Sequence, residues 1–310
     1  MPPSKKARLR SENMSMDSKQ RATSTPGSTC ATTPDPSMDT DSSLTDAQIS
    51  IADQVNYWQS ISPDVTGMLG GFPQVSRIDV QFSRNFIQKL RRFDMKNAIQ
   101  TNNNNNNQSE PQSTGPTEKS TGSFAFQHAL EPGAGIGRVT LNLLAPLCAK
   151  IDIIEPIEKF TAVLTAPESP LVKAHQLQRV WNLPLQEWTA DATPSHQHPE
   201  STTLNKPQYD LIFNQWCLNH LSLASLKSYF QSLIPLLLPG GWIIVKENLS
   251  TDAFGADVFD AEDSSVTRSD ANWRLAFDQA GLKVVKTELQ TGFPKELGLF
   301  PVRIYALRPR

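Results

Sequence analysis

The chain has 310 residues, which is enough for one large domain or two small ones. Its hydrophobic content of 38% lies below the usual globular level, so part of the chain is expected to be unfolded, and its net charge of −2 neither requires nor excludes a nucleic-acid partner. No segment reaches the ~20 apolar residues of a membrane span, and no apolar signal core follows the N-terminus. Three cysteines without metal-type spacing favour a reduced, intracellular protein.

Residues 1–46 are polar and rich in Ser, Thr, Pro and Asp, with almost no large apolar side chains. Such a segment cannot bury enough surface to offset its chain entropy, so we expect a disordered tail. Its basic cluster, residues 5–10, is either a nuclear import signal or a solvated basic tail. The expected location is therefore the cytoplasm, with the nucleus added if the cluster acts as an import signal.

Residues 47–100 change to an amphipathic pattern that is typical of helices. A first helix, capped by Asp46 or Ser50 and ended by Pro63, carries an apolar stripe on one face. A second helix is expected over 82–93, with apolar and basic residues on opposite faces. We interpret the segment as a helical cap that precedes the main domain.

Two further stretches are interpreted from composition. The loop 68–73 is a turn that carries apolar side chains, and core packing is the plain alternative to a functional role for Leu69, Phe72 and Trp58. Residues 101–122 begin with an asparagine run and continue with Ser, Thr, Pro and Gly, which is typical of a low-complexity surface insertion.

From residue 123 to 310, short apolar runs alternate with amphipathic segments. The expected strands cover 124–130, 151–154, 180–185, 209–216, 242–248, 282–289 and 302–307. The expected helices cover 139–150, 158–166, 223–238 and 270–280. The alternation predicts an α/β fold with a mostly parallel seven-stranded sheet. The last two strands have no helix between them and should form a terminal antiparallel hairpin.

The first strand of this region ends in a glycine-rich turn, residues 131–138, with the sequence Glu-Pro-Gly-Ala-Gly-Ile-Gly-Arg. Its glycines let backbone N–H groups approach a ligand closely and aim a helix N-terminus at it. Arg138 stands where the dinucleotide fingerprint has its third glycine. Together with Glu131, the acid before the first glycine, this spacing suits S-adenosylmethionine better than a nicotinamide.

Further polar residues follow the other strands, whose C-terminal ends hold the ligand in an open α/β sheet. Glu155 lies 22 positions after Gly133, where a carboxylate can take both ribose hydroxyls; the alternative is a helix-terminal acid favoured by the dipole. Leu185 and Gln186 offer an adenine ring an apolar wall and an amide. The residues that follow the fourth and fifth strands are Gln215, Trp216, His220 and Asn248.

The segment 257–265 after the fifth strand contains Asp257, Asp260, Glu262, Asp263 and two serines. A charge run is usually a solvated loop. Its position over the expected cofactor site makes it the natural mouth for a substrate instead. Carboxylates at that mouth predict a cationic substrate.

Several motifs together resemble those of the protein α-N-terminal methyltransferases, a class I family that uses S-adenosylmethionine. They are Tyr57-Trp58, the loop 67–72, the turn 133–138, Gln215-Trp216 with His220-Leu221, Lys246 with Asn248, and Asp260 with Asp263-Ser264-Ser265-Val266 and Arg268. The resemblance runs from about residue 53 to the C-terminus. It implies a Rossmann-like fold with an N-terminal helical extension, and mono-, di- or trimethylation of protein N-termini that begin Xaa-Pro-Lys after the initiator Met is removed.

The resemblance also implies roles for individual residues. The S-adenosylmethionine contacts would be Gly133, Gly135, Arg138, Glu155, Leu185, Gln186 and Gln215, with Trp58 closing over the cofactor. The peptide-binding residues would be Leu69, Gly70, Val75, Trp216, Asn248, Asp260, Asp263 and Ser265. Two residues depart from the family pattern: Glu155 stands in place of an Asp, and Phe300 stands in place of a tyrosine.

The expected chemistry requires an uncharged amine. An α-amino group has a pKa near 8, so at neutral pH most of it is protonated and must first lose a proton. His220 and Asp263 are the candidate bases, and Asn248 is expected to hydrogen-bond the terminal peptide. The plain alternative for His220 is a buried histidine that caps a carbonyl.

Two rival functions stay open: a small-molecule amine methyltransferase of the same fold, and a non-catalytic binding protein. A nucleic-acid substrate is disfavoured because an acidic mouth repels phosphates. No metal site is expected, since His196 and His198 in a polar loop are taken as solvated. The implied partners are proteins with free Xaa-Pro-Lys N-termini, such as ribosomal or chromatin proteins, acted on by a monomer without a membrane.

Overall fold

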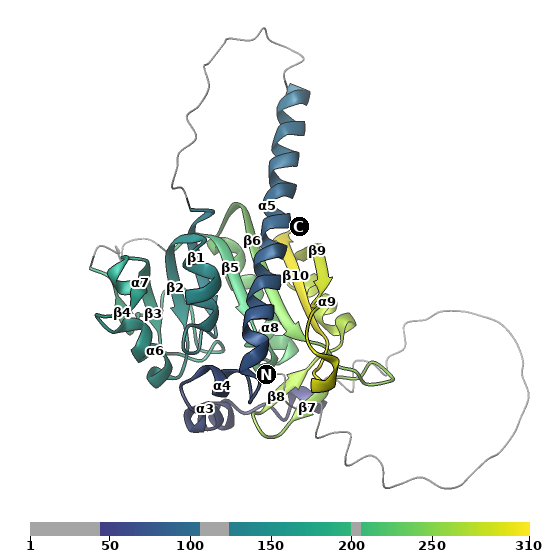
Figure 1. The fold of residues 1–310 in the computed structure, drawn as a ribbon. Helices are drawn as coiled ribbons and strands as arrows, with labels where there is room; N and C mark the ends of the chain where they lie inside the picture. The colour runs from purple at the N-terminus through teal and green to yellow at the C-terminus, as the bar shows by residue number, and fades with distance from the viewer. Residues whose placement is uncertain (1–43, 106–123, 200–205) are drawn as a thin grey trace, which may run out of the picture.

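The computed structural model describes residues 44–105, 124–199 and 206–310 (Figure 1). The expected tail up to residue 43, with its basic cluster, lies outside the described residues, as does the insertion from residue 106 to 122. Within the described parts, no helix is both long enough and apolar enough to cross a membrane.

A single eight-stranded sheet forms the centre of the molecule, in the order β4-β3-β2-β1-β5-β6-β10-β9. The strands are β1 (Phe126–Pro132), β2 (Cys148–Ile154), β3 (Leu177–Trp181), β4 (His196–Gln197), β5 (Tyr209–Gln215), β6 (Leu237–Asn248), β9 (Leu282–Leu289) and β10 (Val302–Pro309). The pairs among β1, β2, β3, β5 and β6 are parallel, and β10 is antiparallel to both β6 and β9. The expected seven-stranded sheet with a terminal antiparallel hairpin is confirmed, with the short β4 added antiparallel at one edge.

Helices cover both faces of the sheet. They are α3 (Ile51–Ser60), α4 (Val65–Met68), α5 (Ser76–Asn105), α6 (Glu158–Thr165), α7 (Pro170–Lys173), α8 (Leu223–Leu233) and α9 (Asp270–Gln279). Short helical turns are η2 (Pro73–Val75), η4 (Thr140–Leu144), η5 (Leu218–His220), η6 (Ile234–Leu236) and η7 (Lys295–Leu297). Two buried clusters separate the layers: α8 and α9 pack on one face, and α5, α6 and α7 pack on the other.

The N-terminal cap consists of α3, α4 and α5. Ser50 caps α3, as expected for one of the two candidates, because its side chain accepts a hydrogen bond from the Asp53 N–H. Helix α5 is much longer than the expected 82–93 and runs into the asparagine-rich stretch. Its first half buries Phe86, Ile87 and Leu90, and Figure 1 shows the rest continuing beyond the sheet.

Two expected helix boundaries are wrong, and a proline explains each. The helix expected over 139–150 is reduced to η4, since Pro146 lacks the N–H that a helix interior needs, and β2 already begins at Cys148. The helix expected to reach residue 238 ends at Leu233, just before Pro235.

The strand boundaries also differ from the expectation. Strand β3 lies at 177–181 and not at 180–185, because Pro184 cannot donate to a sheet ladder. Strand β6 begins at residue 237, so it includes the Pro-Gly-Gly that seemed to separate helix from strand. A small hairpin, β7 (Val258–Asp260) paired with β8 (Ser265–Thr267), lies inside the acidic segment, where polar composition hid it.

Candidate active site

A cavity lies where β1, β2 and β5 end, beneath α3 of the cap. All the residues expected to contact the cofactor line it: Gly133, Gly135, Arg138, Glu155, Leu185, Gln186, Gln215 and Trp58. Trp216 and His220 line it as well. The structure therefore brings these side chains together, while their contacts with a cofactor remain a prediction.

The glycine turn after β1 forms a close-fitting cradle. Gly133, Gly135 and Gly137 have φ angles of +67°, +55° and +80°, a region that side-chain-bearing residues rarely adopt. A Cβ atom on Gly133 would lie 2.3 Å from Cβ of Cys217, and one on Gly135 would lie 2.7 Å from Sδ of Met68. The positive φ angles and the lack of space therefore both require glycine at Gly133 and Gly135, and these two residues line the cavity.

Glu155 at the end of β2 is held in place by two backbone donors. Its Oε2 accepts from the Gly135 N–H at 2.8 Å, and its Oε1 accepts from the Ile157 N–H at 3.0 Å. Burial raises the pKa of its carboxyl to about 7. Ile157 is the N-cap of α6, so Glu155 acts as a helix-terminal acid and still has lone pairs for a ribose.

Glu131 at the end of β1 is a second buried acid on the cavity wall. Its Oε2 accepts a hydrogen bond of 2.5 Å from the Thr140 hydroxyl. Burial raises the pKa of its carboxyl to about 8. At neutral pH this end of the cavity therefore carries less negative charge than two glutamates suggest.

The cap contributes a buried acid, Asp79, that the sequence analysis missed. Its carboxylate meets Arg138, Gln215 and Lys246 at distances of 2.7, 2.9 and 2.5 Å. The signal was present in the sequence, because Asp79 falls on the buried stripe of α5 together with Phe86. A charged residue on an apolar stripe predicts a buried partner.

Helix α3 is fastened across the cavity by hydrogen bonds. The Trp58 indole N–H donates to Nε2 of His220 at 3.1 Å. The His220 carbonyl accepts from Gln54 and from Gln186, each at 2.9 Å. In this arrangement the Nε2 lone pair of His220 is engaged by the cap.

Trp216 directly follows β5 and lines the cavity. Its backbone has a φ of +55°, which is uncommon for a bulky residue, and its N–H donates to the Lys246 carbonyl at 3.1 Å. The Arg138 guanidinium carbon lies 5.3 Å from the centroid of its ring, within the range of a cation–π contact.

Of the eight expected peptide-binding residues, only Trp216 lines this cavity; the other seven do not, namely Leu69, Gly70, Val75, Asn248, Asp260, Asp263 and Ser265. Leu69 and Val75 are fully buried, so core packing accounts for them in the described structure, and Gly70 has a φ of +55° in the turn between α4 and η2. Phe300 is also buried, and the neighbouring Pro301 carbonyl accepts from the Leu249 N–H directly after Asn248. The role of these residues toward a substrate stays a prediction.

The acidic segment is ordered by the β7–β8 hairpin, which pairs Asp260 with Ser265. The Ser265 hydroxyl donates to Oδ1 of Asp263 at 2.7 Å. Ser264, with a φ of +53°, accepts the Ser50 N–H on its hydroxyl and the Gln54 side chain on its carbonyl. The hairpin is thus joined to the same glutamine that lines the cavity.

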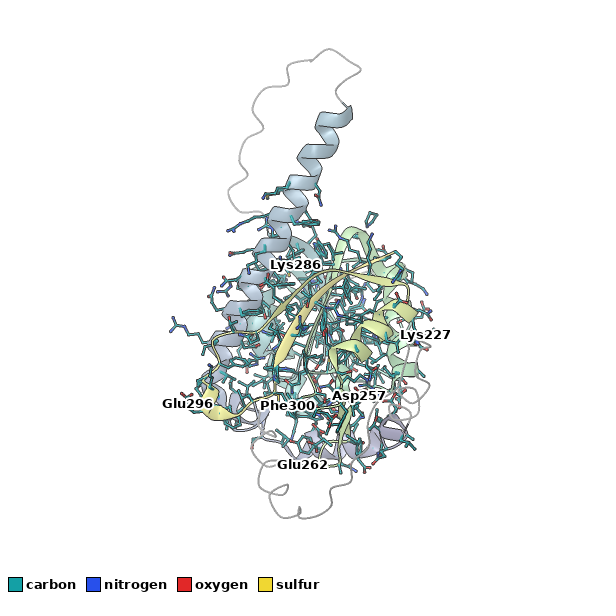
Figure 2. All side chains as sticks on the ribbon, turned by 90° about the vertical axis from the view of Figure 1, so that its right-hand side faces the viewer. Lys227, Asp257, Glu262, Lys286, Glu296 and Phe300 are labelled. Carbon is teal, nitrogen blue, oxygen red and sulfur yellow. The ribbon has the colours of Figure 1, made fainter. Side chains whose placement is uncertain are left out.

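We call the carboxylates of Asp260, Glu262 and Asp263 the acidic mouth. Burial and the negative charges of these three groups raise the pKa of Tyr57 on α3 to about 12. Figure 2 shows Glu262 at the same end of the molecule as Phe300, while Lys286 lies toward the other end. The mouth is therefore an electronegative region next to the cap.

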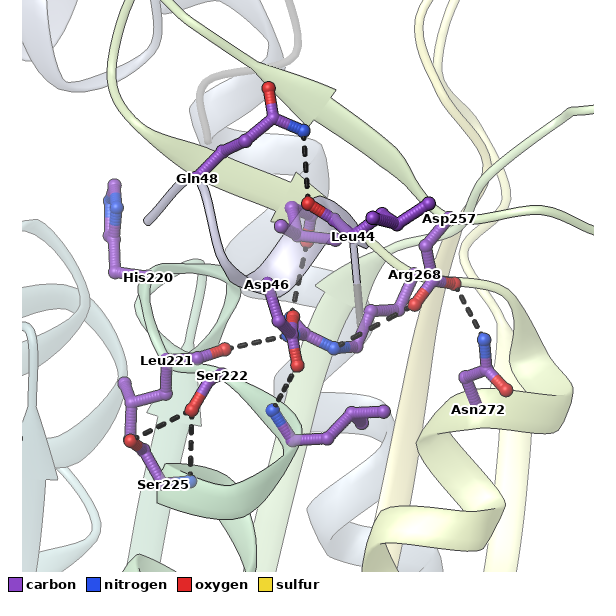
Figure 3. Close-up of polar contacts among 12 residues, drawn as sticks. Leu44, Asp46, Gln48, His220, Leu221, Ser222, Ser225, Asp257, Arg268 and Asn272 are labelled. Atoms are coloured by element: carbon purple, nitrogen blue, oxygen red, sulfur yellow. Dashed lines mark hydrogen bonds and ion pairs between the residues drawn. The ribbon is translucent and has the colours of Figure 1, made fainter. Parts of the chain in front are cut away.

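A buried arginine joins the residues before α3 to the segment after η5 (Figure 3). Arg268 donates to Oδ1 of Asp46 at 2.5 Å and to the Leu221 carbonyl at 2.7 Å. The other oxygen of Asp46 accepts from the Leu223 N–H at 2.5 Å. One network therefore fixes the start of the cap against the loop that carries His220.

Glu247, which the sequence analysis did not single out, supports the turn after β5. Its Oε1 accepts from the N–H groups of Cys217 and Leu218 at 3.0 and 2.9 Å. Burial raises the pKa of its carboxyl to about 7. It holds the backbone between Trp216 and His220.

The histidines of the polar loop lie at the β4 edge, away from the cavity. His175 Nδ1 is 3.0 Å from Nε2 of His198, and burial lowers the pKa of His196. In the part of the chain that the structure describes, no group of three or more His, Cys, Asp or Glu side chains is arranged to hold a metal ion.

Comparison with known proteins gives consistent matches over most of the chain. The model of a family described as AdoMet dependent proline di-methyltransferase matches residues 46–109 and 115–308. The chain is 34% identical to the Alpha N-terminal protein methyltransferase 1 of Arabidopsis thaliana, over 82% of this chain and 78% of that protein. For the protein of the same name in Schizosaccharomyces pombe, identity is 35% over 83% of this chain and 95% of the relative.

Two further matches extend this comparison. The chain is 31% identical to the N-terminal Xaa-Pro-Lys N-methyltransferase 1-A of Xenopus laevis, over 82% of this chain and 92% of that protein. The solved structure of a SAM-dependent methyltransferase from Leishmania major matches with a TM-score of 0.59 and 28% identity, over 83% of this chain and 82% of that one.

Proposed function

The chain belongs to the family of AdoMet-dependent proline di-methyltransferases, and on this basis we propose that it methylates the α-amino group of protein N-termini that begin Xaa-Pro-Lys. Family and fold make it an S-adenosylmethionine-dependent methyltransferase. The acceptor sequence is the proposed part. The observation that carries it is the acidic mouth beside the cavity, which suits a substrate with two positive groups, an amino end and a lysine.

The residues that line the cavity suit S-adenosylmethionine in their chemistry. Gly133 and Gly135 of the glycine turn line the cavity, and Glu155 lies at the end of β2, where its carboxylate can accept from a ribose. Among the described residues, the buried Oε1 of Gln215 has no hydrogen-bond partner, so a ligand that donates a hydrogen bond would satisfy it. When bound there, S-adenosylmethionine supplies an electrophilic methyl carbon on a sulfonium.

The protein side chains have to orient the amine and accept its proton. Asp263 is the better candidate for the acceptor, since it is buried and anchored by the Ser265 hydroxyl. His220 can take a proton at Nε2 only if its bond with Trp58 breaks. We assign Trp216 to the second-position proline, Asn248 to the terminal peptide, and Asp260 to the third-position lysine.

The remaining assignments follow from charge and composition. Ribosomal or chromatin proteins fit as substrates because their basic N-termini complement the acidic mouth. A monomer that works in the cytoplasm, and in the nucleus if residues 5–10 act as an import signal, is the simplest arrangement.

Mass spectrometry of short peptides tests the proposal. The protein and S-adenosylmethionine are incubated with Ser-Pro-Lys, Ser-Pro-Glu and N-acetylated Ser-Pro-Lys peptides that are otherwise identical. We expect methyl groups on the first peptide, few on the second and none on the third. Methylation of the acetylated peptide would place the reaction on the lysine side chain, and methylation of small free amines alone would favour the small-molecule alternative.

A further inference from the structure

Asp79 on α5 does not line the cavity, yet it contacts two residues that do. Its Oδ2 accepts hydrogen bonds from Nη1 of Arg138 at 2.7 Å and from Nε2 of Gln215 at 2.9 Å. Arg138 and Gln215 both belong to the cavity wall. The carboxylate therefore connects the N-terminal cap with two side chains that face the cofactor site.

Lys246 fixes this carboxylate from the other side. Its ammonium group donates to Oδ1 of Asp79 at 2.5 Å, to the Asp79 carbonyl at 3.1 Å and to the Ser83 hydroxyl at 2.9 Å. These contacts use all three donors of the lysine, and Asp79, Lys246 and Ser83 are fully buried. Rotation of the carboxylate would leave a buried ammonium group without its partners.

The cluster holds one negative and two positive charges. Although burial alone would raise it, the charges of Lys246 and Arg138 hold the pKa of Asp79 at about 2, so the carboxylate stays ionised. The donors of Lys246 are all directed at groups within the cluster, whereas Arg138 also lines the cavity. The surplus positive charge thus lies on Arg138 at the cavity wall. A guanidinium has five N–H donors, so Arg138 can bind Asp79 and still donate to an anion in the cavity.

The same carboxylate decides how the Gln215 amide is turned. An ionised carboxylate can only accept hydrogen bonds, so it selects the NH₂ end of the amide. The other end, Oε1, is buried and has no hydrogen-bond partner in the part of the chain that the structure describes. An unpaired buried acceptor is unfavourable, so this oxygen calls for a donor from a ligand in the cavity.

We propose that Asp79 is a positioning residue for the amino-acid end of the cofactor: it holds Arg138 to receive the carboxylate, and it turns the Gln215 carbonyl oxygen to receive the ammonium group. The proposal rests on the proposed function in one respect, the identity of the cofactor. In this proposal the cap contributes to the cofactor site in two ways: α3 lies over the cavity, and α5 supplies Asp79.

Calorimetric binding of two ligands tests this role. S-adenosylhomocysteine carries the amino-acid end, and 5′-methylthioadenosine lacks both its amino and its carboxylate group. Asp79→Asn should weaken S-adenosylhomocysteine binding about 10- to 100-fold and change methylthioadenosine binding about threefold or less. Asp94→Asn is the matched control, because Asp94 lies on the same helix and accepts from Arg308 and Trp242 away from the cavity; it should change neither affinity.

The outcomes separate the two proposals. Equal weakening of both ligands, or of neither, would show that Asp79 has no selective role and would overturn the inference. Wild-type protein that fails to bind S-adenosylhomocysteine would count against the proposed function instead. If Asp79→Asn does not fold, the double variant with Lys246→Met removes both buried charges together, and the same selective loss is expected from it.

Discussion

The two ends of the cavity are built in different ways. The cofactor end contains the turn 131–138, whose three glycines directly follow β1, together with residues at the ends of other strands such as Glu155 and Gln215. The acceptor end is assembled from distant segments: α3, the turn after β5 and the β7–β8 hairpin, joined by bonds such as that between Gln54 and Ser264. Changes at the first end should therefore reduce cofactor binding, and changes at the second should reduce turnover or the docking of the cap.

Asp263→Asn should give the largest difference between an effect on turnover and an effect on cofactor binding. Removal of a proton acceptor should lower kcat on an Xaa-Pro-Lys peptide about 10²- to 10⁴-fold, while cofactor affinity stays within about threefold. Rates from mass spectrometry and affinities from calorimetry measure the two effects separately. His220→Ala should also lose turnover, but less, because Trp58 already engages its Nε2; wild-type rates for both variants would refute the assignment of bases.

The opposite pattern is expected from Gly133→Ala. A Cβ atom there would lie 2.3 Å from Cβ of Cys217, on a backbone with a φ of +67°. Backbone strain and overpacking should lower the free energy of unfolding by about 3 kcal/mol and abolish tight cofactor binding. Gly255→Ala is a control at a positive φ with open space around it, and it should retain binding. Normal cofactor affinity in the Gly133 variant would show that cofactor binding does not depend on the glycine turn.

The connection between the ends depends on Asp46. Asp46→Ala leaves the fully buried Arg268 with Asp257 at 3.9 Å as its other carboxylate. We expect a loss of about 2 kcal/mol in the free energy of unfolding, measured by denaturant titration. Asp53→Ala, an exposed change on the cap helix itself, should cost less than about 0.5 kcal/mol. Equal losses for the two variants would mean that the network around Arg268 contributes no net stability.

The last prediction concerns how the free energy of unfolding depends on pH through two buried acids at the cofactor end. Burial raises the pKa of Glu131 to about 8 and that of Glu155 to about 7, so the folded protein keeps protons that the unfolded chain releases near pH 4.5. The stability from these groups is fully present below about pH 4.5 and is lost as the pH rises to about 8.

Glu131→Gln removes one of these titrating groups. Between pH 5.5 and 8.5 the variant should therefore lose less of its unfolding free energy than the wild type. Denaturant titrations at both pH values measure the difference, with the exposed Glu168→Gln as control. Identical pH slopes for Glu131→Gln and the wild type would show that Glu131 titrates normally.

The same contrast explains how much could be predicted from the sequence. Periodicity was enough for the sheet and its terminal hairpin, because it depends on neighbours in the chain. The rule that a ligand lies at the C-terminal ends of the strands was enough to group the cofactor-end residues. The boundaries that failed lie at Pro146, Pro184 and Pro235, where a single missing N–H overrides the apolar pattern. The positions of such prolines therefore predict the ends of helices and strands better than the apolar pattern does.

Asp79 and Glu247 were missed for another reason. Each is a buried acid whose partners lie on other segments: Asp79 on α5 binds Arg138 and Lys246, and Glu247 on β6 holds the backbone after Trp216. Local sequence does not show such partners, since they are fixed only by packing of the cap and the sheet. An acid at an apolar position is the one signal that local sequence contains.

The central claim is that the acidic mouth selects the third residue of a protein N-terminus. It is tested most directly by the ratio of kcat/KM for Ser-Pro-Lys over Ser-Pro-Glu peptides, measured for the wild type and for Asp260→Asn. We expect a ratio well above one for the wild type and a ratio about tenfold lower for the variant, because one charged contact to the lysine is lost. A ratio that is the same in both proteins would contradict it.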